Sequence, residues 1–230
     1  MRTLACLVAI AATSLTLAAC GGGTTDPHKG EQVITGPQIS SALPPWKPNY
    51  VQLARRARLL GIPDSGSEKF HIHEQLRIYR EGILEPIAEL IGVDVKHKVL
   101  VGLHTHVAEG QYGAPGVIHM EADRPFTAAL GDFFAIWGVK FGGGWLGGLH
   151  ASGDTKLRTF VNGREIKDPA AHVLKKDDNI VIAYGKTNDF DRLPDTTPLK
   201  NANSGKGGCS IGTSKHPAKS CRLELTGKQP

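Results

Sequence analysis

The amino-acid sequence predicts an α+β fold, in which a small mixed β-sheet packs on one main helix. Period-two alternation begins at Phe70, an amphipathic helical segment follows after residue 124, and a hairpin and a buried apolar run come after that helix. Strands that gather around a single packed helix are typical of α+β domains. We place a single domain of this class at residues 49–186, a length that is sufficient for one hydrophobic core.

Residues 1–19 have the pattern of a secretion signal. Arg2 supplies the positive charge, and the apolar stretch after it is too short to span a membrane as a permanent helix. The segment ends in Leu-Ala-Ala-Cys20, which closely resembles the lipobox of bacterial lipoproteins. The resemblance implies cleavage before Cys20 and attachment of lipid, including palmitate, to this residue. The protein would then be exported and anchored to the bacterial cell membrane with its domain outside the cytoplasm, whereas a plain signal peptide is the alternative.

A tether and a first helix are expected next. Residues 20–48 are rich in Gly, Pro and Thr and lack a sustained period, which predicts a disordered tether between anchor and domain. Residues 50–60 predict a helix, because Gly61 and Pro63 stand where a C-cap and a stop are expected.

The alternation that begins at Phe70 predicts a half-buried strand. His71 and His73 share one parity, and the aliphatic residues of the other parity point inward: Ile72, Leu76 and Ile78. Further short strands are expected at residues 99–101 and 117–121.

The strongest helix signal lies in residues 124–141. An apolar face ends before Gly138, and it consists of Leu130, Phe133, Phe134 and Trp137. Thr127 is the expected N-cap of this main core helix, and the glycine-rich residues 142–154 that follow predict a loop.

Two further strand signals close the domain. Residues 156–166 predict a hairpin around the Asn162-Gly163 turn, and residues 179–185 predict a buried strand. This order resembles the end of ubiquitin-like β-grasp domains, where a hairpin follows the helix and a last strand inserts into the sheet. The likeness is one of order, and β-grasp folds host unrelated functions.

Two of the four cysteines lie in the segment expected to be processed, and the other two lie in the C-terminal tail. Cys6 falls in the signal and Cys20 in the lipobox, so Cys209 and Cys221 remain, within an irregular polar tail at residues 187–230. An oxidising exported compartment favours a disulfide between these two. A metal site formed by both cysteines with His216 is the alternative.

Five of the ten histidines fall into two short stretches, and they are His71, His73, His104, His106 and His119. Residues i and i+2 of a strand project from the same face, so each His-X-His pair presents two imidazoles about 6 to 7 Å apart at Cβ. His119 can complete a three-nitrogen site with His104 and His106, and the other pair ranks second. Imidazole nitrogens suit Cu(II) or Zn(II).

A carboxylate could take part in the predicted metal site, and other interpretations of the histidines are possible. Glu109 or Glu121 can supply an oxygen ligand, orient an imidazole or act as a base on metal-bound water. Histidines on a solvated strand, without any ligand, are the plain alternative. The spacing from His104 and His106 to Glu109 comes near the cupin pattern but is one residue short.

The sequence therefore predicts a metal-binding lipoprotein of the cell surface. The alternative is a metal-free cell-envelope module that presents a sheet face to a protein or glycan partner. No catalytic residue is assigned, because no Ser-His-Asp arrangement, HExxH, Walker loop or dinucleotide fingerprint is present; a metallohydrolase is the third hypothesis. A nucleic-acid partner is not expected, because 27 basic and 22 acidic residues leave a mild net charge of +5 without long charge runs.

The domain also resembles a group of exported or membrane-attached bacterial proteins with recurring HTH…GVIHxE, FTLGxFFxIWGV, FVNG and IVIAYG blocks. The matching stretches here are residues 104–106, 116–121, 126–139 with Ala129 in place of Leu, 160–163 and 180–185. The resemblance supports the domain limits and implies no activity.

Overall fold

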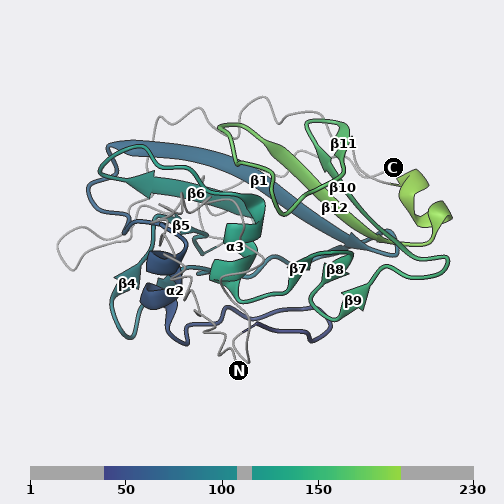
Figure 1. Ribbon diagram of the computed structural model, residues 1–230, viewed down its shortest axis with the longest axis horizontal. Coiled ribbons are helices and arrows are strands. Elements are labelled where there is room, and N and C mark those ends of the chain that lie inside the picture. The colour runs from purple at the N-terminus through teal and green to yellow at the C-terminus, as the bar shows by residue number, and fades with distance from the viewer. Residues whose placement is uncertain (1–38, 108–115, 193–230) are drawn as a thin grey trace, which may run out of the picture.

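A seven-stranded mixed sheet forms the centre of the structure (Figure 1). The computed structural model describes residues 39–107 and 116–192. Six strands lie in the order β11-β10-β12-β1-β6-β5, and β2 pairs with the C-terminal end of β1. Their bounds are β1 (Phe70–Arg80), β2 (Ile83–Glu85), β5 (Leu103–His104), β6 (Val117–Ala122), β10 (Lys156–Val161), β11 (Arg164–Ile166) and β12 (Asn179–Gly185). The α+β prediction is confirmed at this level.

The last strand is inserted into the middle of this sheet. β12 lies between β10 and β1, and it runs parallel to β1 and antiparallel to β10. The hairpin that precedes it turns at Asn162 and Gly163, whose φ angles of 51° and 80° suit the tight turn that an Asn-Gly pair favours. The predicted strands at residues 117–121 and 179–185 and the predicted hairpin are thus confirmed.

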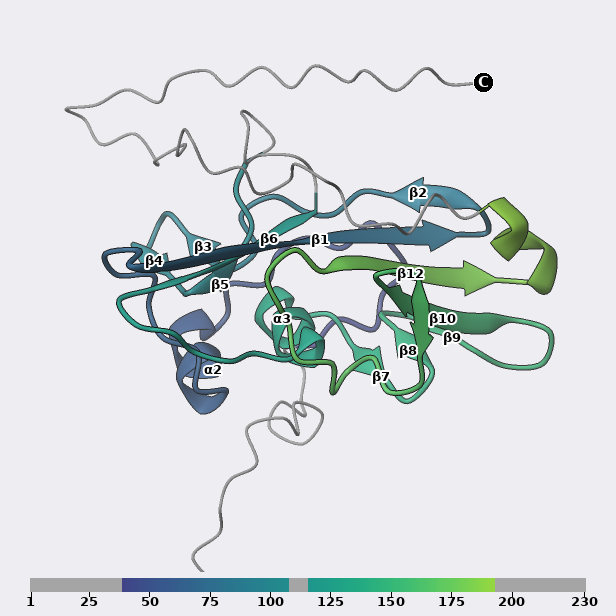
Figure 2. The ribbon, with the colours of Figure 1, turned by 90° about the horizontal axis from the view of Figure 1, so that it is seen from above.

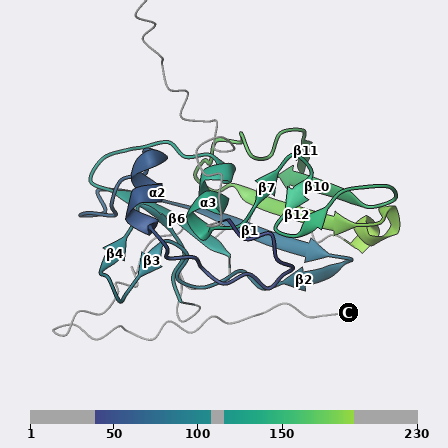
Figure 3. The same ribbon diagram turned by 60° about the horizontal axis from the view of Figure 1, so that its bottom comes forward.

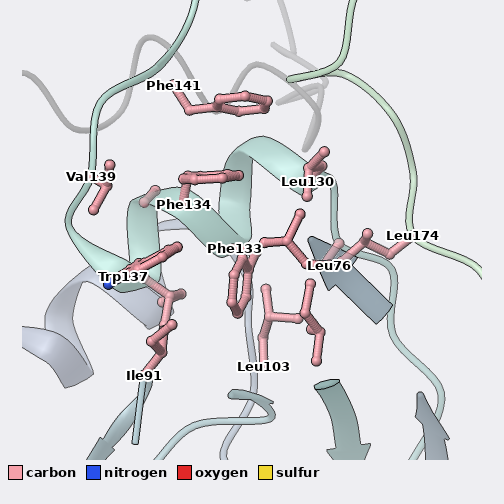
Figure 4. Packing of buried hydrophobic residues seen from close by; sticks show 14 of the residues in the cluster. Leu76, Ile91, Leu103, Leu130, Phe133, Phe134, Trp137, Val139, Phe141 and Leu174 are labelled. Carbon is pink, nitrogen blue, oxygen red and sulfur yellow. The ribbon is translucent and has the colours of Figure 1, made fainter. Parts of the chain in front are cut away.

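Within the described residues, the α-helices α2 (Leu53–Leu59) and α3 (Leu130–Trp137) lie on the same side of the main sheet (Figure 2). Every residue of α3 is buried, and its apolar side chains belong to the hydrophobic core. Figure 4 shows Phe133 directed at Leu76 of β1 and Leu103 of β5, so one face of the sheet packs on this helix. The aliphatic parity of β1 therefore points inward, as predicted.

The N-cap of α3 differs from the prediction. Ala129 occupies this position, and its backbone N–H donates to the carboxylate of Asp132 at 2.7 Å. Thr127 stands two residues too early, because the chain is still extended at Ala129. Gly138, with φ of 81°, ends the helix in the left-handed conformation that glycine adopts without strain.

The glycine-rich residues after α3 form strands rather than the expected loop. β7 (Phe141–Gly142), β8 (Trp145–Leu146) and β9 (Leu149–His150) make a small antiparallel sheet. Leu146 is fully buried and Phe141 and Leu149 nearly so, which gives this sheet an apolar side against the core. A further two-stranded sheet pairs β3 (Val93–Asp94) with β4 (Val99–Leu100).

The segment before α2 contradicts part of the tether prediction. Residues 39–48 pack on the domain, and Figure 3 shows them in purple leading into α2. Trp46 is only 4% exposed and packs edge to face against Trp137, with the ring centroids 5.8 Å apart. Ser40 forms an isolated backbone β-bridge with Val139. The domain therefore begins about ten residues earlier than its composition indicates.

At the C-terminal end of the described residues, the chain forms the 3₁₀ helix η1 (Thr187–Arg192), in which Phe190 is buried. The rest of the predicted tail, including Cys209 and Cys221, lies outside the described residues, as do Cys20 and the segment predicted to be a secretion signal. Among the helices at residues 39–107 and 116–192, none has both the length and the apolar character needed to cross a membrane.

Candidate metal centre

Three adjacent strands bring the five predicted histidines together. β6 lies between β1 and β5, and His119 of β6 pairs with His73 on one side and with His104 on the other. His71 pairs with Glu121 in the next row of the same face. The two His-X-His pairs, which are far apart in the sequence, therefore share one face of one sheet.

This face is the one turned away from α3. The residues of opposite parity, Ile72, Met120 and Leu103, pair with one another across the same three strands. Met120 and Leu103 belong to the hydrophobic core. Because side chains alternate along a strand, the aliphatic side holds the sheet on the helix, and the reverse side presents the histidines.

The carboxylate of Glu121 lies at the centre of the histidines. Its Oε1 is 2.8 Å from Nε2 of His71 and 2.9 Å from Nδ1 of His119. Its Oε2 is 3.5 Å from Nε2 of His104, and Nε2 of His106 is 3.8 Å from Oε1. One carboxylate is thus within reach of imidazoles from all three strands.

Within each His-X-His pair the ring nitrogens converge. The Nε2 atoms of His71 and His73 are 2.8 Å apart, and those of His104 and His106 are 3.1 Å apart. Nitrogens at such distances can share a proton in a hydrogen bond or direct two lone pairs at one ion. Two ligands of a tetrahedral ion with Zn–N bonds near 2.0 to 2.1 Å are separated by roughly 3.3 Å, so small adjustments would accommodate an ion.

The potential ligands form two overlapping sets. One set contains His71, His73, His119 and Glu121, and in the other His104 and His106 replace the first pair. In each set one ligand atom from every residue lies within 4.8 Å of the others. Three imidazole nitrogens and one carboxylate oxygen make a complete four-coordinate shell, so this cluster could hold a metal ion.

Contacts outside the two sets fix the buried members. Nδ1 of His104 lies 2.9 Å from the carbonyl oxygen of Val101 and donates its proton to it, which leaves the Nε2 lone pair directed into the cluster. The hydroxyl of Ser65 donates to Oε2 of Glu121 at 3.2 Å. Such contacts orient metal ligands and reduce the reorganisation that binding requires.

The protonation states suit metal binding. Burial lowers the pKa of His104 to about 3, so this imidazole is neutral at physiological pH. Burial alone would raise the pKa of Glu121, but the favourable interactions of the carboxylate with His106, His119 and His71 outweigh it and hold the pKa of this carboxyl well below its ordinary value. The hydrogen bond to Glu121 raises the pKa of His71. The cluster therefore combines an ionised carboxylate with a buried neutral imidazole.

The remaining histidines and the second candidate carboxylate lie either outside the described residues or away from this cluster. Glu109 and His216 lie outside the described residues. His97 contacts Asp94, His172 contacts Asp178, and His150 stacks on Trp145, all away from the cluster. The structure adds Ser65 and the Val101 carbonyl, which sequence reasoning missed because neither belongs to a periodic pattern or a recognisable motif.

Comparison of the chain with protein-family models, curated proteins and solved structures gave no match. The fold and the site define the chain as an α+β protein with a largely buried His/Glu cluster that could hold a metal ion.

Proposed function

We propose that this protein is a surface lipoprotein that binds copper or zinc through the cluster of His71, His73, His104, His106, His119 and Glu121. The observation that carries the proposal is the convergence of five imidazoles and one carboxylate from three adjacent strands onto a largely buried point. The role that follows is to capture or hold a metal ion outside the cytoplasm.

The composition of the cluster favours a transition metal over a simple polar network. Glu121 is ionised although its side chain is only 3% exposed, and the imidazole of His104 beside it is neutral, so a bound cation would compensate this buried negative charge more completely. The donor set is rich in nitrogen, which suits Cu(II) and Zn(II) and does not suit Mg(II) or Ca(II), since these prefer oxygen.

The location and the fold family are inferred from the sequence and the strand order. The lipobox ending at Cys20 supports export and lipid anchoring to the bacterial cell membrane. The order of helix, hairpin and inserted parallel strand supports a β-grasp-like sheet. Incorporation of labelled palmitate that disappears in a Cys20→Ser variant tests the anchor independently of the metal.

The test of metal binding compares the protein with two double variants. Equilibrium dialysis and competition with a chromophoric chelator measure stoichiometry and Kd for Zn(II) and Cu(II). We expect stoichiometric binding by the native protein and a Kd at least about tenfold weaker after His104→Ala/His106→Ala. Loss of a residue that hydrogen-bonds to a metal ligand typically weakens metal affinity by about 10- to 100-fold, and loss of a ligand itself should weaken it at least as much.

A matched control removes two histidines outside the cluster, His97 and His150. His97→Ala/His150→Ala should leave the Kd unchanged, which separates the cluster from nonspecific imidazole binding. A native affinity that survives His104→Ala/His106→Ala in a folded protein would contradict the proposed ligands. A native protein without bound metal that is recovered with an envelope partner would favour the alternative function.

A further inference from the structure

We propose that the cluster binds one ion at a time in two overlapping positions, and that the ion enters at one position and passes to the other through His119 and Glu121. The outer position uses His71 and His73, and the inner position uses His104 and His106. This inference rests on the proposed metal binding and adds a direction of transfer within the site.

The geometry of the shared residues supports two positions. His119 and Glu121 belong to both four-residue sets, so an ion that moves between the sets keeps two of its four ligands. Oε1 of Glu121 lies 2.8 Å from Nε2 of His71, and Oε2 lies 3.5 Å from Nε2 of His104. Nε2 of His106 is 3.8 Å from Oε1, so one carboxylate lies near histidines of both pairs, and transfer requires only exchange of one histidine pair for the other.

Electrostatics favours one ion over two. Ions in a two-metal site are about 3.5 to 4 Å apart. At a given distance two divalent ions repel each other about four times as strongly as two single charges. Glu121 is the one carboxylate among the six ligand residues, so it cannot offset both ions. A second ion should therefore bind only after the first has left.

Exposure sets the direction of entry. The side chain of His71 is 32% exposed, compared with 16% for His106 and 0% for His104. An exposed imidazole can take an ion from water or from a donor molecule by stepwise ligand exchange. His104 is buried and held by the Val101 carbonyl, so the inner set is the better organised and the slower to exchange.

Kinetic measurements on the full chain test this transfer. Loading and release of Zn(II) are followed by stopped flow with a chromophoric chelator, and stoichiometry is determined by dialysis. For the native protein we expect one ion per chain. For His71→Ala/His73→Ala we expect one ion, a Kd within about tenfold of native, and loading and release at least about tenfold slower, because the entry ligands are lost.

The inner pair should behave in the opposite way. His104→Ala/His106→Ala should load about as fast as the native protein and bind at least about tenfold more weakly, since the ion is confined to the outer set. Asn substitutions of the same pairs provide a second variant of each kind, and circular dichroism of the metal-free proteins verifies that each one folds.

Two results would overturn the transfer while leaving metal binding intact. One is a native stoichiometry of two ions per chain, and the other is an unchanged loading rate in both outer-pair variants. Absence of stoichiometric binding by the native protein would instead overturn the proposed function itself, so the two failures are distinguishable.

Discussion

Glu74 is a buried carboxyl group on the helix-facing side of β1, opposite the histidines. It is 2% exposed, and among the described residues neither of its carboxylate oxygens has a hydrogen-bond partner. An unpaired buried polar group destabilises a fold by about 1 to 3 kcal/mol. Glu74→Met keeps the length of the side chain and removes both oxygens, so we expect a gain of roughly 2 kcal/mol at pH 8, or about 4 to 8 °C in Tm.

The gain should depend on pH in a defined direction. Burial, followed by the nearby charges of Asp178 and Asp177, raises the pKa of Glu74 well above the ordinary value of 4.5. The folded protein therefore holds this proton more tightly than the unfolded chain does. The native protein loses stability as the pH rises from about 4.5 towards the folded pKa, whereas the Met variant has no such titration. The difference between the two should be small near pH 4 and largest at pH 8.

Thermal and urea unfolding of the metal-free proteins between pH 4 and pH 8 measure this difference. Glu74→Gln removes the charge but keeps a polar amide, so its gain should be smaller than that of Glu74→Met. A Met variant that is less stable than the native protein at pH 8 would refute the reasoning, because it would show that the carboxyl group is stabilised by a favourable contact.

Three further substitutions test the core, a cap and the site. Trp137→Ala should destabilise the protein by about 3 to 5 kcal/mol, because Trp137 is fully buried; a Tm that barely moves would contradict its place in the core. Asp132→Ala removes the acceptor of the Ala129 N–H and should lower the stability by about 1 kcal/mol in urea unfolding, whereas an unchanged midpoint would argue against the cap. Glu121→Gln should weaken Zn(II) binding at least about tenfold in chelator competition; equal affinity would show that the carboxylate is not a ligand.

The sequence predicted the elements whose signal is local. The alternation through Ile72, Leu76 and Ile78 assigned both the strand and its inward face, since a period of two has one geometric meaning. The apolar face ending before Gly138 likewise located α3 to within a few residues. The burial of Trp46 was missed, because a Pro- and Gly-rich composition describes the average of a segment and hides one aromatic side chain that packs on the core.

The meeting of the two histidine pairs could not be predicted, because it depends on strand register. His73, His119 and His104 lie in one row only because β6 is positioned between β1 and β5 with this pairing. A shift of β6 by one residue would turn His119 and Glu121 to the face that packs on α3. No local pattern specifies which strands become neighbours across so many residues.

The register is instead fixed by the aliphatic side of the same strands. Leu103 and Met120 are 0% and 1% exposed, and they must face the core for α3 to pack on the sheet. Because alternate residues point to opposite faces, burial of Leu103 and Met120 also sets the positions of His104 and His119. The burial of this aliphatic side thus stabilises the arrangement that holds buried imidazoles and an ionised carboxylate together. A cluster arranged in this way would need little reorganisation to bind the proposed metal ion.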